Sequence, residues 1–197
     1  MSRSLPQLIR DGYRRPREAA RYLLDLDLQP SVLVQAALLL VIINTLSLVL
    51  LYDAMERYSP DPIQIIQPPL LIGTFVQLIF VVICSYMVKL LSPAFGKKVS
   101  FAQSATIFIW FNLIQLCGAM AALLVVMVFG LLAFFVPIIP MVWTIWALGQ
   151  YWAELVENKT SFVGFLLVVV AILITLPILG VLVSLLGLPG VEIIKNV

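Results

Sequence analysis

The sequence contains no histidine, and its two cysteines, Cys84 and Cys117, are far apart and form no C-x-x-C motif. Histidine is the commonest metal ligand and general base in proteins. Paired cysteines are the other frequent basis of metal and redox sites. We therefore expect a protein that is not an enzyme, has no cofactor or bound metal, and has no nucleic-acid partner.

Charge is also scarce. Charged residues make up 11% of the chain, against roughly 25% in an ordinary soluble domain, and the mean hydropathy is +1.11. No Asp, Glu, Lys or Arg occurs from Val99 to Ala153, or from Thr160 to Val191. These long uncharged runs predict an integral membrane protein whose first partner is the lipid bilayer.

The apolar runs are long enough for five membrane-spanning helices. A helix crosses a hydrocarbon core about 30 Å thick with about 20 residues, so the longer uncharged run must hold two crossings. We place the spans at residues 32–52, 69–91, 103–128, 134–154 and 161–187. They are expected to be helices because lipid offers no hydrogen-bond partner to the backbone. The predicted fold class is all-α, with an arm at 1–30, a membrane domain at 31–188 and a short tail at 189–197.

The basic residues lie mostly on one side of these spans. Ten of the twelve precede span one or lie near the loops after spans two and four: Arg3, Arg10, Arg14, Arg15, Arg17, Arg21, Lys89, Lys97, Lys98 and Lys159. Only Arg57 and Lys195 lie on the other side. Because positive residues gather in cytoplasmic loops, we expect the N-terminus in the cytoplasm and the C-terminus and the tail outside.

The loop FGKKVSFAQ, residues 95–103, interrupts the apolar sequence between spans two and three. Gly96 suits the stop of a helix that ends near Pro93. Ser100 and Gln103 have the spacing of a capping box, in which each side chain bonds the backbone N–H of the other residue. The loop is thus predicted to be a helix stop, two charges that fix topology, and a helix start. Thr160 and Ser161 repeat part of this pattern before span five and suggest the same type of cap.

The N-terminal arm has an amphipathic pattern. In its first part, Leu5, Leu8 and Ile9 share a helical face that Gly12 can end, and Pro16 suits the start of a second helix. In that second helix the apolar positions recur at helical spacing: Ala19, Ala20, Leu23 and Leu24. We expect an interfacial helix pair lying on the membrane, or alternatively a docking site for a protein partner. The candidate residues for a partner or membrane surface are Arg14, Arg15, Arg17, Arg21, Lys97 and Lys98.

Inside the spans the polar residues are neutral. The main candidates are Asn44, Gln77, Asn112 and Gln115. Such side chains commonly hydrogen-bond between helices, and the alternative is a polar pathway for a small solute or lipid headgroup. Four aromatic residues gather in span four. We expect Tyr151 and Trp152 to form an interfacial belt, and Trp143 and Trp146 to pack against helices.

Two short motifs resemble the Yip domain family, membrane proteins named for interacting with Ypt/Rab GTPases. The loop matches the family's bacterial branch at Gly96, Lys97, Ser100 and Phe101, and the sequence Arg15-Pro16-Arg17-Glu18-Ala19-Ala20 is similar to that branch's Pro-x-x-Ala-Ala entry. The resemblance implies five spans, a cytoplasmic arm and a location in the bacterial inner membrane. Phe95 replaces the first loop glycine, and residues 25–30, DLDLQP, keep little of the eukaryotic Asp-Leu-Tyr-Gly-Pro motif.

Together these features predict a non-enzymatic membrane adaptor, scaffold or membrane-organising protein. Its working surface would be cytoplasmic, formed by the arm, the loop at 95–103 and residues 154–160, and would meet a protein partner or a second copy of the chain. The alternative is a permease or transport accessory that uses the neutral polar residues.

Overall fold

The computed structural model describes residues 4–58, 70–129 and 138–185, and within these ranges it is helical and has no strand. The helices in chain order are α1 (Leu5–Arg14), α2 (Pro16–Asp25), α3 (Pro30–Tyr58), α4 (Leu70–Phe95), α5 (Phe101–Phe129), α6 (Ile138–Leu155) and α7 (Ser161–Leu185). The all-α prediction is confirmed for these residues. The predicted tail at 189–197 and residues 134–137 of the fourth predicted span lie outside the described ranges.

Four of the helices are long and apolar enough to cross a membrane. Their qualifying stretches are Pro30–Ser47, Ile72–Phe95, Phe101–Ala121 and Ser161–Leu185. Each overlaps a predicted span, so the chain is an integral membrane protein. The shorter helix α6 falls where the fourth span was predicted, but it is not among these four helices. The fifth crossing stays a prediction.

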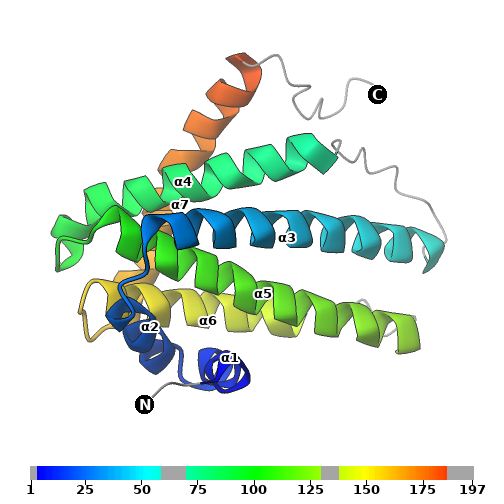
Figure 1. Cartoon of the computed structure of the whole chain (residues 1–197), viewed down its shortest axis with the longest axis horizontal. Coiled ribbons are helices and arrows are strands. Elements are labelled where there is room, and N and C mark those ends of the chain that lie inside the picture. The colour runs from blue at the N-terminus through cyan, green and yellow to red at the C-terminus, as the bar shows by residue number, and fades with distance from the viewer. Residues whose placement is uncertain (1–3, 59–69, 130–137, 186–197) are drawn as a thin grey trace.

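The long helices lie side by side in a bundle, with the N-terminal arm against one flank (Figure 1). Helix α7 packs against α4 and α6, and α3 packs against α4 and α5. The arm consists of α1 and α2; α2 contacts α5 and α6, and α1 contacts α5. The segments between α4 and α5 and between α6 and α7 lie at the same end of the bundle as α2, which we call the arm end (Figure 1).

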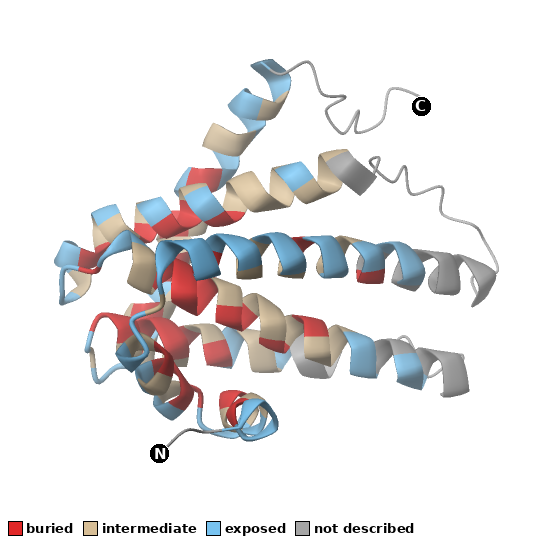
Figure 2. Cartoon of the chain, in the orientation of Figure 1, coloured by how far each residue is buried: buried red, intermediate tan, exposed pale blue. Residues whose placement is uncertain are grey.

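Buried residues gather toward the arm end. Figure 2 shows them on the arm and on the adjoining halves of α5 and α6, whereas α3 is exposed along most of its described length. The largest fully buried side chains include Trp152, Tyr151, Ile107 and Ile114. The apolar residues exposed on α3, such as Leu39 and Leu50, suit contact with lipid. The protein-filled core therefore lies where the arm is packed.

Helices α6 and α7 approach closely through glycine. A Cβ at Gly164 would collide with the backbone nitrogen of Ala153 and lie 2.5 Å from the carbonyl oxygen of Gly149. Small residues at such crossings let two membrane helices bring their backbones together. This crossing sets α6 firmly against α7 and presents the other side of α6 to the arm.

Candidate functional site

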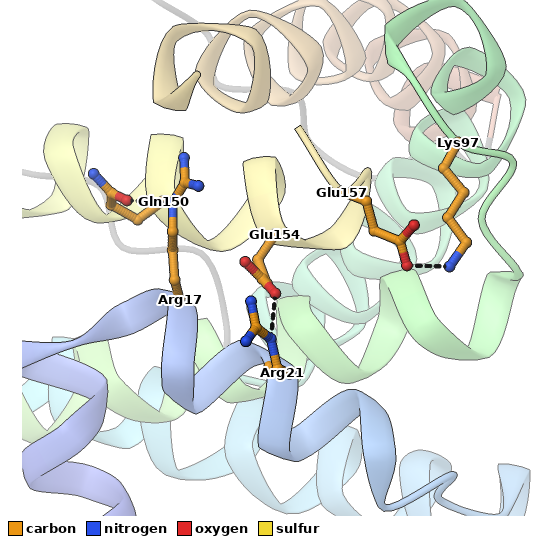
Figure 3. A network of polar contacts seen from close by, with 6 residues as sticks. All are labelled: Arg17, Arg21, Lys97, Gln150, Glu154 and Glu157. Atoms are coloured by element: carbon orange, nitrogen blue, oxygen red, sulfur yellow. Dashed lines mark hydrogen bonds and ion pairs between the residues drawn. The ribbon is translucent and has the colours of Figure 1, made fainter. Parts of the chain in front are cut away.

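The arm is held to α6 by two arginines that lie four residues apart. Arg17 donates from Nε to Oε1 of Gln150 at 2.7 Å, and Arg21 donates from Nε to Oε1 of Glu154 at 2.8 Å. The acceptors Gln150 and Glu154 are also four residues apart, so one turn of α2 matches one turn of α6. Figure 3 shows both arginines reaching from α2 to α6.

Arg17 makes further bonds beyond α6. Its Nη2 donates to the carbonyl oxygen of Lys159 at 2.8 Å and to the hydroxyl of Ser161 at 3.2 Å. One planar guanidinium thus joins α2, α6 and the start of α7 through donors on two separate nitrogens, whereas the donors of a lysine all lie on one nitrogen. Ser161 is the first residue of α7 and accepts from Arg17. Its role therefore differs from that of Ser100, and the expectation of the same cap is wrong.

Arg21 lies at the solvent edge of this contact. Its side chain is 70% exposed, whereas that of Glu154 is 13% exposed. The hydrogen bond to Glu154, and then the charge of that carboxylate, raise the pKa of Arg21. Arg21 therefore neutralises a carboxylate that is largely enclosed by the fold.

Deeper in the structure, the end of α1 is fixed by hydrogen bonds to its backbone. Tyr151 donates its hydroxyl proton to the carbonyl oxygen of Gly12 at 3.1 Å, and Trp143 donates from Nε1 to the carbonyl oxygen of Tyr13 at 3.2 Å. The Tyr13 hydroxyl donates to the carbonyl oxygen of Ile114 on α5 at 2.6 Å. Three side-chain donors therefore fix the position of α1 relative to α5 and α6.

Gly12 allows this close approach without displacing its neighbours. A Cβ at this position would lie 2.7 Å from Cδ1 of Ile114 and 3.0 Å from the hydroxyl of Tyr151. The expectation that Gly12 ends the first helix is wrong, because α1 continues to Arg14. The predicted start of the second helix at Pro16 is confirmed.

Most of the apolar face of the arm is covered by protein, although Leu5 at its start is 59% exposed. Ala19 and Ala20 are completely buried, and Leu8 and Leu23 are 7% and 5% exposed. These residues belong to the same apolar cluster as Ile114 and the other core residues of the bundle. The expectation that this face rests on lipid is therefore wrong for these buried positions, since an amphipathic pattern looks the same whether lipid or protein covers it.

An aromatic cluster lies beneath the arm. The ring of Phe111 contacts those of Trp143, Tyr151 and Trp152, with centroids 6.5, 5.9 and 5.3 Å away. The predicted interfacial belt is wrong, because Tyr151 and Trp152 are completely buried. Trp143 packs against helices as predicted. Trp146 does not, since it is 46% exposed.

The loop between α4 and α5 carries the predicted cap. The Ser100 N–H donates to Oε1 of Gln103 at 3.0 Å, and the Gln103 N–H donates to the Ser100 hydroxyl at 3.1 Å. Gly96 has a φ of +146°. A Cβ there would lie 2.8 Å from the carbonyl oxygen of Val156, so glycine is needed both for its backbone conformation and for its contact with the α6–α7 loop. Helix α4 ends at Phe95, two residues later than expected.

The predicted surface residues fall into two groups. Arg17 and Arg21 hold the arm, and Lys97 pairs with Glu157 at 2.6 Å across the two loops (Figure 3). The others are exposed: Arg14, Arg15 and Lys98. The structure thus brings the arm, the 95–103 loop and residues 154–160 together at the arm end.

The predicted intramembrane polar residues do not form one site. Gln77 and Asn112 line the same cavity between α3, α4 and α5, of about 10 Å³, which is close to the minimum for one water molecule. Gln115 donates to Thr144 on α6 at 3.4 Å, a contact between helices. Asn44 is half-buried on α3 and does not line this cavity.

Sequence reasoning did not assign Gln150, Gly12 or Tyr13 to this contact, and it included Glu154 only as part of the surface at 154–160. The matching four-residue spacing of Arg17 with Arg21 and of Gln150 with Glu154 was the available signal. In the described ranges no group of three or more Cys, Asp and Glu side chains is placed to hold a metal ion. The contacts bind and position helices. Comparisons with protein-family models, curated proteins and solved structures found no match.

Proposed function

We propose that the protein is a non-enzymatic membrane adaptor of Yip type, with five spans and its arm end in the cytoplasm of a bacterium. The observation that carries the proposal is the assembly of three distant segments at the arm end. The ion pairs Arg21–Glu154 and Lys97–Glu157 join these segments. Arg14, Arg15 and Lys98 stay exposed beside them. Such a surface suits a partner protein with an acidic face.

The Yip assignment rests on the loop and arm motifs of the sequence. Two of their residues have a definite structural purpose here: Gly96 approaches the backbone of Val156, and Ser100 caps α5. The fifth crossing rests on α6, whose length of 18 residues is about 27 Å at 1.5 Å per residue. The permease alternative receives no support from the cavity at Gln77 and Asn112, which has room for about one water molecule.

Topology is tested by single-cysteine labelling in intact cells, in a chain whose native cysteines are replaced by alanine. A cysteine at Lys97 should be protected from an impermeant reagent, and a cysteine at Asn196 should react. Reaction at Lys97 from outside would overturn the five-span arrangement. The reasoning is that six arginines ahead of the first predicted span, at 32–52, outweigh the single Arg57 that follows it.

Partner recruitment is tested by crosslinking and pull-down in mild detergent. The variant is Lys97→Gln with Lys98→Gln. The Lys97–Glu157 pair is largely exposed and worth at most about 1 kcal/mol, so the variant should fold and insert normally. We expect loss of the recovered partner. Recovery equal to that of the unmodified protein would exclude a binding role for the loop.

A further inference from the structure

Helix α1 is packed far from the arm-end tips of α5 and α6, toward the middle of these helices. Gly12 and Tyr13 contact Ile114, which is 13 residues after the first residue of α5, or about 20 Å along the helix axis. Trp143, which bonds Tyr13, is 12 residues before the last residue of α6, or about 18 Å. In Figure 1, α1 accordingly lies beside the length of α5 and α6, inward from their arm-end tips.

On the other flanks, exposed apolar side chains begin at the helix ends. Val32, near the start of α3, is 45% exposed, and Phe162, the second residue of α7, is 66% exposed. Further along the same helices, Ile42 and Leu173 are 44% and 62% exposed. In the proposed topology, such side chains suit contact with lipid chains. The hydrocarbon layer would then reach close to the arm end along α3 and α7.

On the flank of α5 and α6 where α1 packs, charged side chains lie at a similar distance from the arm end. The face of α1 turned away from the bundle bears Gln7, Arg10 and Arg14, all exposed, while Leu8 and Gly12 are buried on the opposite face. An arginine in the hydrocarbon costs at least about 2.5 kcal/mol. This face must therefore meet a polar environment, at a level where α3 and α7 meet lipid chains.

Trp146 gives an independent indication of that level. It is 46% exposed, one turn from Trp143 and nine residues, or about 14 Å, from the last residue of α6. An exposed indole is most stable where its ring meets acyl chains and its N–H meets headgroups. On this flank, Trp146 and the arginines of α1 would all lie at the boundary between headgroups and acyl chains if that boundary were displaced toward the bilayer centre.

We propose that anionic lipid headgroups bind the outer face of α1 through Arg10 and Arg14, and that the cytoplasmic leaflet is indented along the α5–α6 flank. The occupant is a lipid phosphate, which a guanidinium can bind with two parallel hydrogen bonds. Helix α1 lies at the level of Ile114, and the 15 residues from Ile114 to the end of α5 extend about 22 Å. If headgroups reach α1, the bilayer along this flank would therefore be thinner than its usual 30 Å or so. The inference rests on the proposed topology, in which α5 and α6 both cross the membrane.

The depth of α1 is measured with spin labels on the full-length chain in phosphatidylcholine–phosphatidylglycerol nanodiscs, with Cys84 and Cys117 replaced by alanine. One label is placed at Gln7, which leaves both arginines intact. Control labels at Ile42 and Leu173 are each 12 residues from the first residue of their helix. We expect the Gln7 label to be accessible to a water-soluble nickel complex and the two control labels to oxygen.

The possible outcomes separate the indentation from the topology. A Gln7 label that meets oxygen in preference to nickel would overturn the indentation, and a label shielded from both would show that a second copy or another protein covers α1. If the control labels also met nickel, the proposed topology would be wrong instead. The Gln7 label alone decides the inference about α1 when both controls lie in hydrocarbon.

Charge recognition is measured with Arg10→Gln plus Arg14→Gln, against Lys97→Gln plus Lys98→Gln as a control that removes the same charge from the same end. Native mass spectrometry counts phosphatidylglycerol retained against phosphatidylcholine. The arginine variant should lose about fivefold of this preference per arginine, with an unchanged melting temperature because both side chains are exposed. Equal loss in the two variants, or no loss in the arginine variant, would overturn the headgroup site.

Discussion

Arg17 is the residue on which docking of the arm should depend most. Arg17→Ala removes bonds to Gln150, to the carbonyl oxygen of Lys159 and to Ser161. A hydrogen bond from a charged donor contributes about 1.5 to 3 kcal/mol net. The three share one side chain and one of them is exposed, so they do not add fully, and we expect a loss of about 3 kcal/mol in docking. That corresponds to a change of roughly 100-fold in the docking equilibrium.

The matched control for this prediction is Arg15→Ala in the same helix. Arg15 is 68% exposed and pairs with Glu18 at 3.4 Å, so its loss should cost at most about 1 kcal/mol. The assay is amide hydrogen exchange of residues 8–25 in detergent. Exchange should accelerate by roughly 100-fold in Arg17→Ala, while the amides of α7 keep their protection. Equal exchange in the two variants would refute the docking role of Arg17.

Four further variants test other parts of the structure. Gly164→Ala should lower the melting temperature by forcing a Cβ against Ala153, at a cost of about 1 to 3 kcal/mol, whereas Gly180→Ala, with open space around it, should be neutral or stabilising. Ser100→Ala should lower the free energy of unfolding by about 1 kcal/mol without affecting insertion; no change would mean that the cap contributes nothing. Burial raises the pKa of Tyr13 to about 12. The native state thus holds this proton more tightly than the unfolded chain, whose pKa is about 10, so this group should lower stability as the pH rises from about 10 to 12. Tyr13→Phe should weaken the fall in stability over this range in pH-resolved melting curves, and an unchanged pH dependence would contradict the assignment.

The membrane helices could be predicted because their signal is local. A run of apolar residues has to be helical in lipid whatever its neighbours do, and the qualifying stretches at Ile72–Phe95 and Ser161–Leu185 lie close to the spans expected at 69–91 and 161–187. The cap at Ser100 is equally local, because both of its partners lie within four residues. Such features need no knowledge of the tertiary structure.

The position of the arm could not be predicted in the same way. Leu8 and Leu23 are apolar in a polar segment, and this pattern is equally compatible with a bilayer surface and with a protein groove. What decides between them is the shape of the groove: Gly12 allows α1 to approach Ile114, and Tyr151 donates to the Gly12 carbonyl. These contacts join residues more than 100 positions apart, and no pattern within either segment encodes them.

The same contacts explain why α6 is the least clear of the expected spans. Its arm-end half contains Gln150 and Glu154, polar groups that would be costly in hydrocarbon, and Arg17 and Arg21 satisfy both. A buried polar group destabilises the fold unless it has a hydrogen-bond partner. The arm provides these partners for α6. The apolar cluster that contains Ala19 and Ala20 extends without interruption into the bundle. A chain without its arm should therefore lose order first in α6, before the more apolar α4 and α7.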